Sequence, residues 1–251
     1  MSVLTTTTHG STLVLELNRP EKRNALNREL VDALKTGLTA ADVDSSIRAV
    51  LLRGAGKDFC SGADLAELQK ISQYSFEENV QDARELADLF ELIRRIQKPV
   101  IAAVHGRALA GGCGLATACD LAIATRTASF GYPEVRIGFV PAMVAAILRR
   151  TLGEKQSFEM LTQGFEFSAE EARALGLVNA IFDDEVFDVA SIEYASRYVK
   201  VSSSAVAMTK RLLYGIDGLP LADAIAMGVE TNARARMTED CKKGIAKFVR
   251  K

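Results

Sequence analysis

The chain alternates between short apolar runs and segments with the spacing of an amphipathic helix. Leu13, Leu15 and Leu17 stand at every second position, which is typical of a strand. Residues 26–38 then repeat apolar side chains with helical spacing, and residues 47–54 form the next apolar run. Because strand and helix patterns alternate in this way, the sequence predicts an α/β fold with parallel strands.

The same order continues through the middle of the chain. Residues 76–96 have the spacing of a long amphipathic helix, which Pro99 ends. The apolar runs at residues 100–104 and 120–125 predict a third and a fourth strand. The units differ in length, so the pattern does not indicate a solenoid of fixed period.

From about residue 141 the pattern becomes helical. Ser168 and Glu171 have the spacing of a capping box at the start of one of these helices. We therefore expect a core over residues 1–190 and a helical region over residues 191–251. The last helices carry more apolar residues than a small appendage can bury alone, which favours association with other subunits.

Length and charge exclude several classes of protein. The chain has 251 residues, of which 48% are hydrophobic and 25% are charged, and this is enough for one large core. Lysine and arginine together number 31 against 32 aspartates and glutamates, so the basic face that nucleic acid requires is not expected. No uninterrupted apolar span of 18 residues is present, so a transmembrane helix is not expected either.

The cysteines and the first residues bear on compartment and on metal binding. The four cysteines lack the CxxC spacing of a metal site, and their low number is typical of a reduced, cytoplasmic protein. Residues 1–10 form a polar arm, which does not resemble a signal peptide. We therefore expect a cytoplasmic protein with no metal.

The segment HGRALAGGCGLATACDLAIA, residues 105–124, concentrates glycine at positions 106, 111, 112 and 114. Glycine destabilises a regular element, so its density here calls for a reason. A strand, a glycine turn and a helix start would place backbone N–H groups where an anion or a developing oxyanion is stabilised. The alternative is a tight packing turn that binds nothing. The spacing fits neither a phosphate-binding loop nor a dinucleotide fingerprint.

A second turn, KDFCSGADL at residues 57–65, also lies between a predicted strand and a predicted helix. It offers the N–H of Ala63 near a helix start, and it places Asp64 where a negative charge suits the helix dipole. Two such turns on neighbouring strands could each donate one N–H to the same oxygen atom.

Glu134 is the candidate for proton transfer. It stands in the segment GYPEVRIGFV, whose apolar residues would raise the pKa of a carboxyl and make it a useful acid at neutral pH. The alternative is a solvated glutamate in a surface loop. The sequence has two histidines: His9 in the polar arm and His105 at a strand end, where a structural role is expected. A Ser–His–Asp peptidase therefore has little support.

Five blocks of the sequence resemble the enoyl-CoA hydratase/isomerase, or crotonase, superfamily. In order they are NRPEKRNALN, FCSGADL, KPVIAAVHGRALAGGCGLATACDLAIAT, ASFGYPEVRIGFVP and LTQGFEFSAEEARALGLVNAIF, and the resemblance runs nearly end to end. It implies a spiral of ββα units, a helical C-terminal oligomerisation region that forms a homotrimer or a dimer of trimers, and an acyl-CoA thioester as substrate. No separate cofactor is implied, because coenzyme A enters as part of the thioester.

The resemblance also implies roles for individual residues. The N–H groups of Ala63 and Gly111 would hold the thioester oxygen, and Glu134 aligns with a catalytic glutamate of the family. The loop around Lys22 resembles one that meets the nucleotide, and the segment KGIAKFVRK resembles one that approaches the coenzyme A of a neighbouring subunit. The implied substrate and coenzyme A contacts are Lys22, Arg23, Ala25, Ala63, Asp64, Leu65, Gly111, Gly114, Phe248 and Lys251.

Gly114 departs from the family pattern. Two-carboxylate hydratases of the family carry a second glutamate directly after GGC, where this chain has Gly114. The change removes a carboxyl and is expected to leave room in the pocket, while Asp120 is expected to close the helix. We therefore expect an enoyl-CoA hydratase with Glu134 as its one catalytic carboxyl. The alternatives are a Δ3-Δ2-enoyl-CoA isomerase and a non-catalytic acyl-CoA-binding protein.

Overall fold

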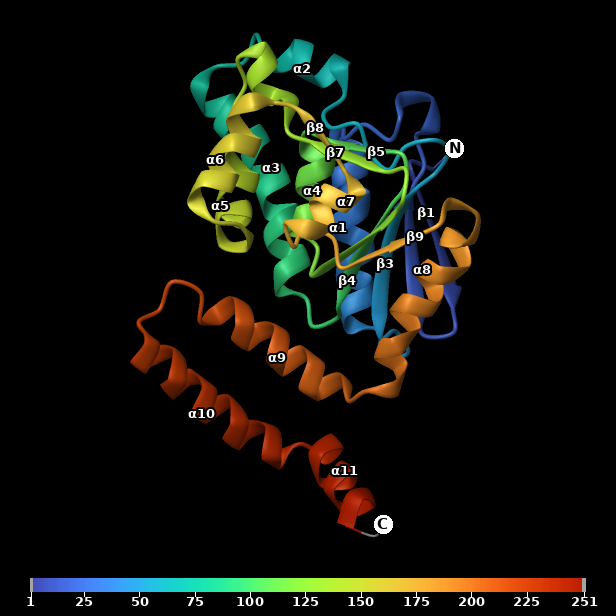
Figure 1. Cartoon of the computed structure of the whole chain (residues 1–251), viewed down its shortest axis with the longest axis vertical. Coiled ribbons are helices and arrows are strands. Elements are labelled where there is room, and N and C mark those ends of the chain that lie inside the picture. The colour runs from blue at the N-terminus through green and yellow to red at the C-terminus, as the bar shows by residue number, and fades with distance from the viewer. Residues whose placement is uncertain (1, 250–251) are drawn as a thin grey trace.

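A six-stranded sheet forms the centre of the molecule (Figure 1). The structure is a computed structural model that describes residues 2–249, apart from the side chain of Leu65. The sheet is parallel except for the antiparallel pair β1–β2. Its strands, in spatial order, are β1 (Leu4–His9), β2 (Thr12–Leu17), β3 (Ala49–Gly54), β4 (Val100–Val104), β6 (Leu121–Thr125) and β9 (Ala180–Phe182).

A second, three-stranded sheet lies against the first near the carboxyl ends of β3 and β4. Its strands are β5 (Arg107–Leu109), β7 (Ser129–Gly131) and β8 (Glu166–Ser168). The turn after β3 meets this smaller sheet at a bridge between Cys60 and Ala108. The turn at residues 57–65 and the glycine turn after β4 therefore lie side by side at the carboxyl ends of neighbouring strands.

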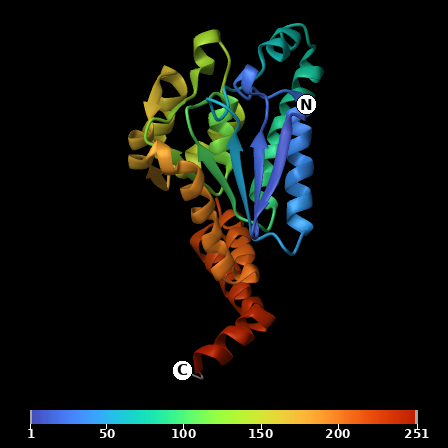
Figure 2. The same ribbon diagram turned by 90° about the vertical axis from the view of Figure 1, so that its right-hand side faces the viewer.

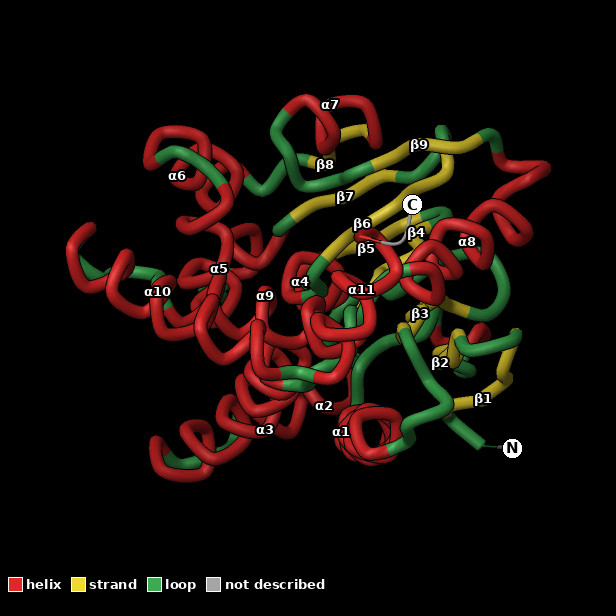
Figure 3. The backbone as a smooth tube through the Cα atoms, turned by 90° about the horizontal axis from the view of Figure 1, so that it is seen from below, coloured by secondary structure: helices red, strands yellow, loops and turns green. Residues whose placement is uncertain are grey.

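Helices cover both faces of the larger sheet (Figure 3). Helices α1, α3 and α4 pack over one face in the larger hydrophobic cluster, and α8 packs over the other face. The α-helices are α1 (Arg28–Val43), α2 (Leu65–Ile71), α3 (Phe76–Arg95), α4 (Gly111–Ala118), α5 (Ala142–Thr151), α6 (Glu154–Gln163), α7 (Ala169–Ala174), α8 (Phe187–Ser196), α9 (Ser203–Gly215), α10 (Leu221–Met237) and α11 (Glu239–Val249). The 3-10 turns are η1 (Pro20–Lys22), η2 (Pro133–Ile137), η3 (Asp184–Val186) and η4 (Arg197–Lys200).

Local sequence explains where the helices begin. Asn27 caps α1 by accepting from the N–H of Leu30, and Ser75 forms a capping box at the start of α3. The predicted box of Ser168 with Glu171 is confirmed at α7. These caps satisfy N–H groups that the helix itself leaves without partners.

The strands behave as the alternation predicts, with one exception. In β2, Leu15 and Leu17 enter the larger cluster and Val14 enters the smaller one, so both faces of the strand are covered. The polar arm expected at residues 1–10 is wrong for residues 4–9, which form the edge strand β1. Its four threonines are β-branched, which suits a strand, and most of them are exposed to water. Because the segment has threonines in place of alternating apolar residues, its sequence does not show the pattern of a strand.

Helices α9, α10 and α11 extend from the body as an arm (Figures 1 and 2). Large apolar side chains stay exposed on it, among them Leu221 at 78% and Val229 at 66%. Helix α8, by contrast, packs on the sheet through Phe187 and Ala195. The boundary expected near residue 190 falls inside α8 and stays a prediction, as does the oligomerisation role of the arm.

A buried ion pair fastens the arm to the body. The Nζ of Lys210, on α9, lies 2.6 Å from Oδ2 of Asp120 and also donates to the carbonyls of Ile93 and Lys98. The hydroxyl of Tyr214 donates to the other carboxylate oxygen at 2.6 Å. The expectation that Asp120 closes the glycine-segment helix is therefore wrong, because α4 ends at Ala118 and Asp120 instead holds α9.

Replacing Asp120 with alanine should lower the free energy of unfolding by about 3–5 kcal/mol, because the ammonium of Lys210 then stays buried without its carboxylate. Lys210→Met is the matched control: it removes the charge, and Asp120 keeps the hydroxyl of Tyr214 and the N–H of Val100 as donors. Urea unfolding measures both variants. Equal losses for the two would contradict the extra penalty for leaving the ammonium of Lys210 buried without its carboxylate.

Candidate active site

Backbone hydrogen bonds join the two turns that follow β3 and β4. The N–H of Cys60 donates to the carbonyl of Arg107 at 3.1 Å, and the N–H of Leu109 donates back to Cys60 at 3.0 Å. A Cβ on Gly112 would lie 2.3 Å from the carbonyl oxygen of Cys60, and one on Gly106 would lie 2.1 Å from that of Lys57. Gly106 and Gly112 therefore allow the two turns to pack closely. For these two of the four glycines, the alternative of a tight packing turn is correct.

Gly111 has a different environment. A Cβ there would meet its nearest atom, in Leu26, at an ordinary 3.5 Å. Gly111 is the first residue of α4, so its N–H points out of the helix start. Within residues 2–249, the N–H groups of Gly111 and Ala63 donate to no acceptor of the protein, and both residues line one cavity. A Cβ on Gly62 would lie 3.4 Å from the nitrogen of Gly111, so the two turns are in contact.

Ala110 holds the turn in a conformation that the sequence did not reveal. Its φ is 49° and its ψ is −126°, a backbone conformation that alanine rarely adopts. The N–H of Ala110 donates to Gly131 at 2.8 Å and its carbonyl accepts from Gly114 at 2.9 Å, so both sides of the residue are fixed. Strain of this kind is found at functional sites, where the surroundings hold it. It fixes the direction of the following peptide, which carries the N–H of Gly111.

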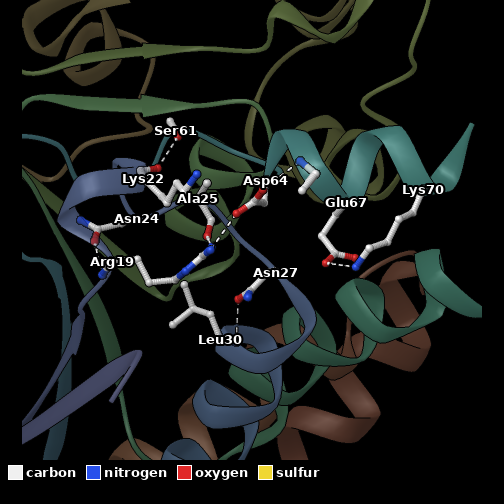
Figure 4. A network of polar contacts seen from close by, with 11 residues as sticks. Arg19, Lys22, Asn24, Ala25, Asn27, Leu30, Ser61, Asp64, Glu67 and Lys70 are labelled. Atoms are coloured by element: carbon white, nitrogen blue, oxygen red, sulfur yellow. Dashed lines mark hydrogen bonds and ion pairs between the residues drawn. The ribbon is translucent and has the colours of Figure 1, made fainter. Parts of the chain in front are cut away.

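Polar contacts from the first loop brace the other turn (Figure 4). The guanidinium of Arg19 lies 2.7 Å from Oδ2 of Asp64 and also donates to the carbonyl of Ala25. The second oxygen of Asp64 caps α2 by accepting from the N–H of Ala66 at 2.9 Å. The hydrogen bond from Arg19 holds the pKa of the Asp64 carboxyl below its usual range. These contacts give Asp64 a supporting role in the turn, and its contact with substrate stays a prediction.

The predicted coenzyme A contacts fall into two groups. Lys22 and Arg23 are exposed on the first loop, and the carbonyl of Arg23 accepts from the N–H of Ser61 at 3.0 Å, beside the Ala63 turn. Ala25 is buried in the same loop. Leu65 begins α2, and its side chain lies outside the described part of the structure.

Phe248 does not line this cavity. Phe248 is 82% exposed on α11, at the far end of the arm (Figure 1). Lys251 lies outside the described residues. Their expected contact with the coenzyme A of a neighbouring subunit stays a prediction.

The cavity beside the two turns has a volume of about 360 Å³. It lies between the two turns, α3, α5 and the 3-10 turn η2, and its walls are mainly apolar. Among the described residues that line it, Glu134 is the one that carries a carboxyl. A long apolar group can enter such a space with its polar end at the helix starts.

Glu134 lies half-buried on η2, and its Oε2 is buried with no hydrogen-bond partner within residues 2–249. Burial raises the pKa of this carboxyl. The residue two positions earlier, Tyr132, is fully buried, and its hydroxyl lies 2.7 Å from Oγ1 of Thr117 on α4. This bond ties the turn that carries Glu134 to the helix that begins at Gly111.

Comparison with known proteins identifies the family of the chain. A family model described as "Enoyl-CoA hydratase/isomerase" matches residues 7–251. The chain belongs to the enoyl-CoA hydratase/isomerase family. It is 40% identical over 242 residues to a Thermus thermophilus protein named "Putative enoyl-CoA hydratase", covering 96% of each chain. It is 35% identical over 246 residues to "Crotonyl-CoA hydratase" of Syntrophomonas wolfei, covering 95% of this chain and 91% of that one.

Solved structures of the enoyl-CoA hydratase/isomerase family confirm the fold. An enoyl-CoA hydratase from Mycobacterium smegmatis superposes with a TM-score of 0.93 at 34% identity, covering 99% of this chain and 96% of that one. The predicted α/β crotonase fold is therefore confirmed, and the protein is an enzyme of the hydratase/isomerase family. Within residues 2–249, no helix has the length and apolar character to span a membrane.

Apolar side chains lie close to the position of the family's second glutamate. A Cβ on Gly114 would lie 3.1 Å from Cζ of Phe90 and 3.6 Å from Cβ of Val144. Phe90 and Val144 are each 4% exposed, and both line the cavity. A Cβ at position 114 would be tight against the ring of Phe90, while Gly114 itself lines the cavity, so the expectation that it leaves room in the pocket stays a prediction. The sequence carries no signal for this, since Phe90 belongs to a different helix.

Proposed function

We propose that the chain is an enoyl-CoA hydratase that adds water across the double bond of a 2-enoyl-CoA thioester with Glu134 as its one catalytic carboxyl. One observation carries the proposal. Glu134, Ala63 and Gly111 line the same apolar cavity, and within residues 2–249 neither Oε2 of Glu134 nor the N–H groups of Ala63 and Gly111 have a hydrogen-bond partner.

The steps follow from these positions. The carboxylate of Glu134 accepts a proton from water as the water oxygen bonds to the β carbon. The electron pair of the double bond moves to the thioester oxygen, where the N–H groups of Ala63 and Gly111 stabilise the enolate. The enolate then collapses, and the α carbon takes the proton from the carboxyl. One water is consumed, and a 3-hydroxyacyl-CoA is formed.

The rate effects known for such groups are large enough for these two roles, stabilisation of the enolate and transfer of the proton. In other enzymes one oxyanion donor is worth about 3 kcal/mol of barrier and a positioned acid or base about 10²–10⁴-fold in rate. Two helix starts meet at the proposed oxygen, and their partial positive charges add to the donors. Coenzyme A enters with the substrate, so the proposal needs no further cofactor.

A second candidate function is Δ3-Δ2-enoyl-CoA isomerisation. Phe90 and Val144 surround Gly114, so that wall offers no polar group to hold a water opposite Glu134. Isomerisation needs no water. The carboxylate of Glu134 would take a proton from carbon 2 of a 3-enoyl-CoA and return it to carbon 4, as the double bond moves into conjugation.

Turnover of crotonyl-CoA beside trans-3-hexenoyl-CoA separates these functions. The proposal expects loss of the conjugated absorbance of crotonyl-CoA together with formation of 3-hydroxybutyryl-CoA. Conjugation of the 3-enoyl substrate without hydration of crotonyl-CoA would instead assign the isomerase. Binding of acyl-CoA without either reaction would assign the non-catalytic protein.

The raised pKa of Glu134 predicts a pH dependence of turnover. The base must be ionised to accept a proton from water, so the rate should fall on the acid side with a midpoint above 4.5, the ordinary pKa of a glutamate. The pH profile of kcat/KM with crotonyl-CoA measures this midpoint. A profile that stays flat down to the ordinary value would remove Glu134 as the base.

The same shift predicts a pH dependence of stability. Above 4.5 and below the raised pKa, the folded state binds more protons than the unfolded state. The free energy of unfolding contributed by Glu134 therefore falls as the pH rises through this window. Glu134→Gln should be more stable than the parent protein above the window and show no such gain below it. Urea unfolding at several pH values makes the comparison.

The subunit arrangement belongs to the same proposal. The exposed apolar side chains of α10 and α11, such as Ile225 and Phe248, would be covered in a homotrimer or a dimer of trimers. Sedimentation of the purified chain tests this, and a stable, active monomer at micromolar concentration would contradict it.

A further inference from the structure

Helix α4 forms a smooth wall beside the proposed oxyanion position. Gly111 and Gly114 are three residues apart, so they lie on the same face of the helix, about 4.5 Å apart along its axis. Both line the cavity and neither has a side chain. This argument rests on the proposed function, which places the thioester oxygen at Gly111. The carbon chain of the substrate then passes Gly114.

The ring of Phe90 stands where this wall passes Gly114. Its Cζ and Cε2 lie 3.1 and 3.4 Å from the position of a Cβ on Gly114. Val144, from α5, closes the same corner, with its Cβ at 3.6 Å from that position. Three helices therefore meet around one buried aromatic ring at the edge of the cavity.

The ring is held in place by its own helix. Phe90 lies on α3, whose neighbouring side chains Leu89 and Ile93 are fully buried in the larger cluster. The carbonyl of Ile93 also accepts from the Nζ of Lys210 at 2.8 Å, which fixes this part of α3. Close packing leaves such a ring little room to move aside for a longer substrate.

We propose that Phe90, packed against Gly114 and Val144, limits the length of the acyl group that the site accepts. The protein then prefers short, straight acyl chains of the size of crotonyl or hexenoyl. Gly114 contributes to the same length limit, because the ring packs directly against the position that a Cβ on this residue would take.

The test is a series of 2-enoyl-CoA thioesters: crotonyl, hexenoyl, octenoyl and decenoyl. The parent protein should favour the two shorter ones. Phe90→Ala should raise kcat/KM for decenoyl-CoA relative to crotonyl-CoA by about tenfold or more, since even one methylene in an apolar pocket changes the rate by about 10–200-fold. Phe90→Leu, which removes less buried volume, should move the preference in the same direction.

The matched control is Phe76→Ala. Phe76 lies on the same helix and is 77% exposed, so its loss should leave the chain-length profile unchanged. Circular dichroism and thermal unfolding establish that each variant is folded. Folded Phe90→Leu protein with the chain-length profile of the parent would overturn the proposal, even if Phe90→Ala does not fold.

A reciprocal pair tests the contact itself. Gly114→Ala adds a methyl group 3.1 Å from the ring and should lower kcat/KM for hexenoyl-CoA more than for crotonyl-CoA. In the Phe90→Leu background this selective loss should shrink, because the atom in contact is gone. Equal losses in both backgrounds would show that the two residues act independently, which contradicts the proposal.

Binding separates this inference from the proposed function. Calorimetry with butyryl-CoA and decanoyl-CoA, which have no double bond to hydrate, measures length preference without turnover. If the Phe90 variants shift this preference but no enoyl-CoA reacts, the proposed function fails and the length limit stands. If enoyl-CoA reacts and neither binding nor turnover shifts with length, the length limit fails and the function stands.

Discussion

Glu134→Gln should lower kcat for crotonyl-CoA by about 10²–10⁴-fold and leave the affinity for acyl-CoA nearly unchanged. Glutamine keeps the size of the side chain but cannot accept the proton of a water at neutral pH. The N–H groups of Ala63 and Gly111 are untouched by the change, so the proposed contacts with the thioester oxygen should persist. Steady-state kinetics with crotonyl-CoA and calorimetry with butyryl-CoA measure the two effects separately.

The control for this variant is Glu159→Gln, an exposed glutamate on α6 that does not line the cavity. It should keep the parent kcat. A folded Glu134→Gln protein with turnover within tenfold of the parent would show that another group moves the proton. Loss of binding together with turnover would instead show that the carboxyl positions the substrate.

The large elements of the fold could be predicted from the sequence because each buries an apolar face in one of the two hydrophobic clusters. The structure confirms the strand expected at Leu13, Leu15 and Leu17, the strands expected at residues 47–54, 100–104 and 120–125, and the helix expected at residues 76–96. The three-residue strands β5, β7, β8 and β9 were not predicted, because so short a segment has no measurable periodicity. The pairing of β5 with β7 nevertheless places Gly131 against Ala110 and fixes the glycine turn.

The candidate site was readable to a different extent. The turns at Ala63 and Gly111 and the apolar setting of Glu134 were visible in local sequence, because helix starts and neighbouring residues decide them. Their assignment as a thioester site came from the family resemblance. The positive φ of Ala110 had no signal, since alanine is not a residue that this conformation selects.

Roles that depend on distant parts of the chain were missed. Asp120 binds Lys210, which is ninety residues further along. The ring that closes the corner at Gly114 comes from Phe90 on another helix. A single sequence contains both partners of such a contact, but nothing in their spacing shows that they meet. Tertiary packing alone gives these residues their roles.

Gly112→Ala should lower the free energy of unfolding by about 3 kcal/mol or more and abolish measurable turnover. Its new Cβ would lie 2.3 Å from the carbonyl oxygen of Cys60 and 2.8 Å from the Cβ of Cys60. That carbonyl accepts from the N–H of Leu109, so the two turns cannot separate without losing the bond that joins them. Any shift of the two turns also changes the relative position of the N–H groups of Ala63 and Gly111, which the proposed function assigns to the thioester oxygen.

Gly111→Ala is the matched control for stability, one residue away. Its Cβ would meet Leu26 at 3.5 Å and Leu86 at 3.9 Å, which are ordinary contacts, and alanine is the better residue in a helix. Urea unfolding should therefore show less than about 1 kcal/mol of change. Equal stability of the two variants would contradict the packing role of Gly112. A large difference between their free energies of unfolding would show that Gly112 is required for packing the two turns together, whereas Gly111 is not required for packing and is available to face a ligand.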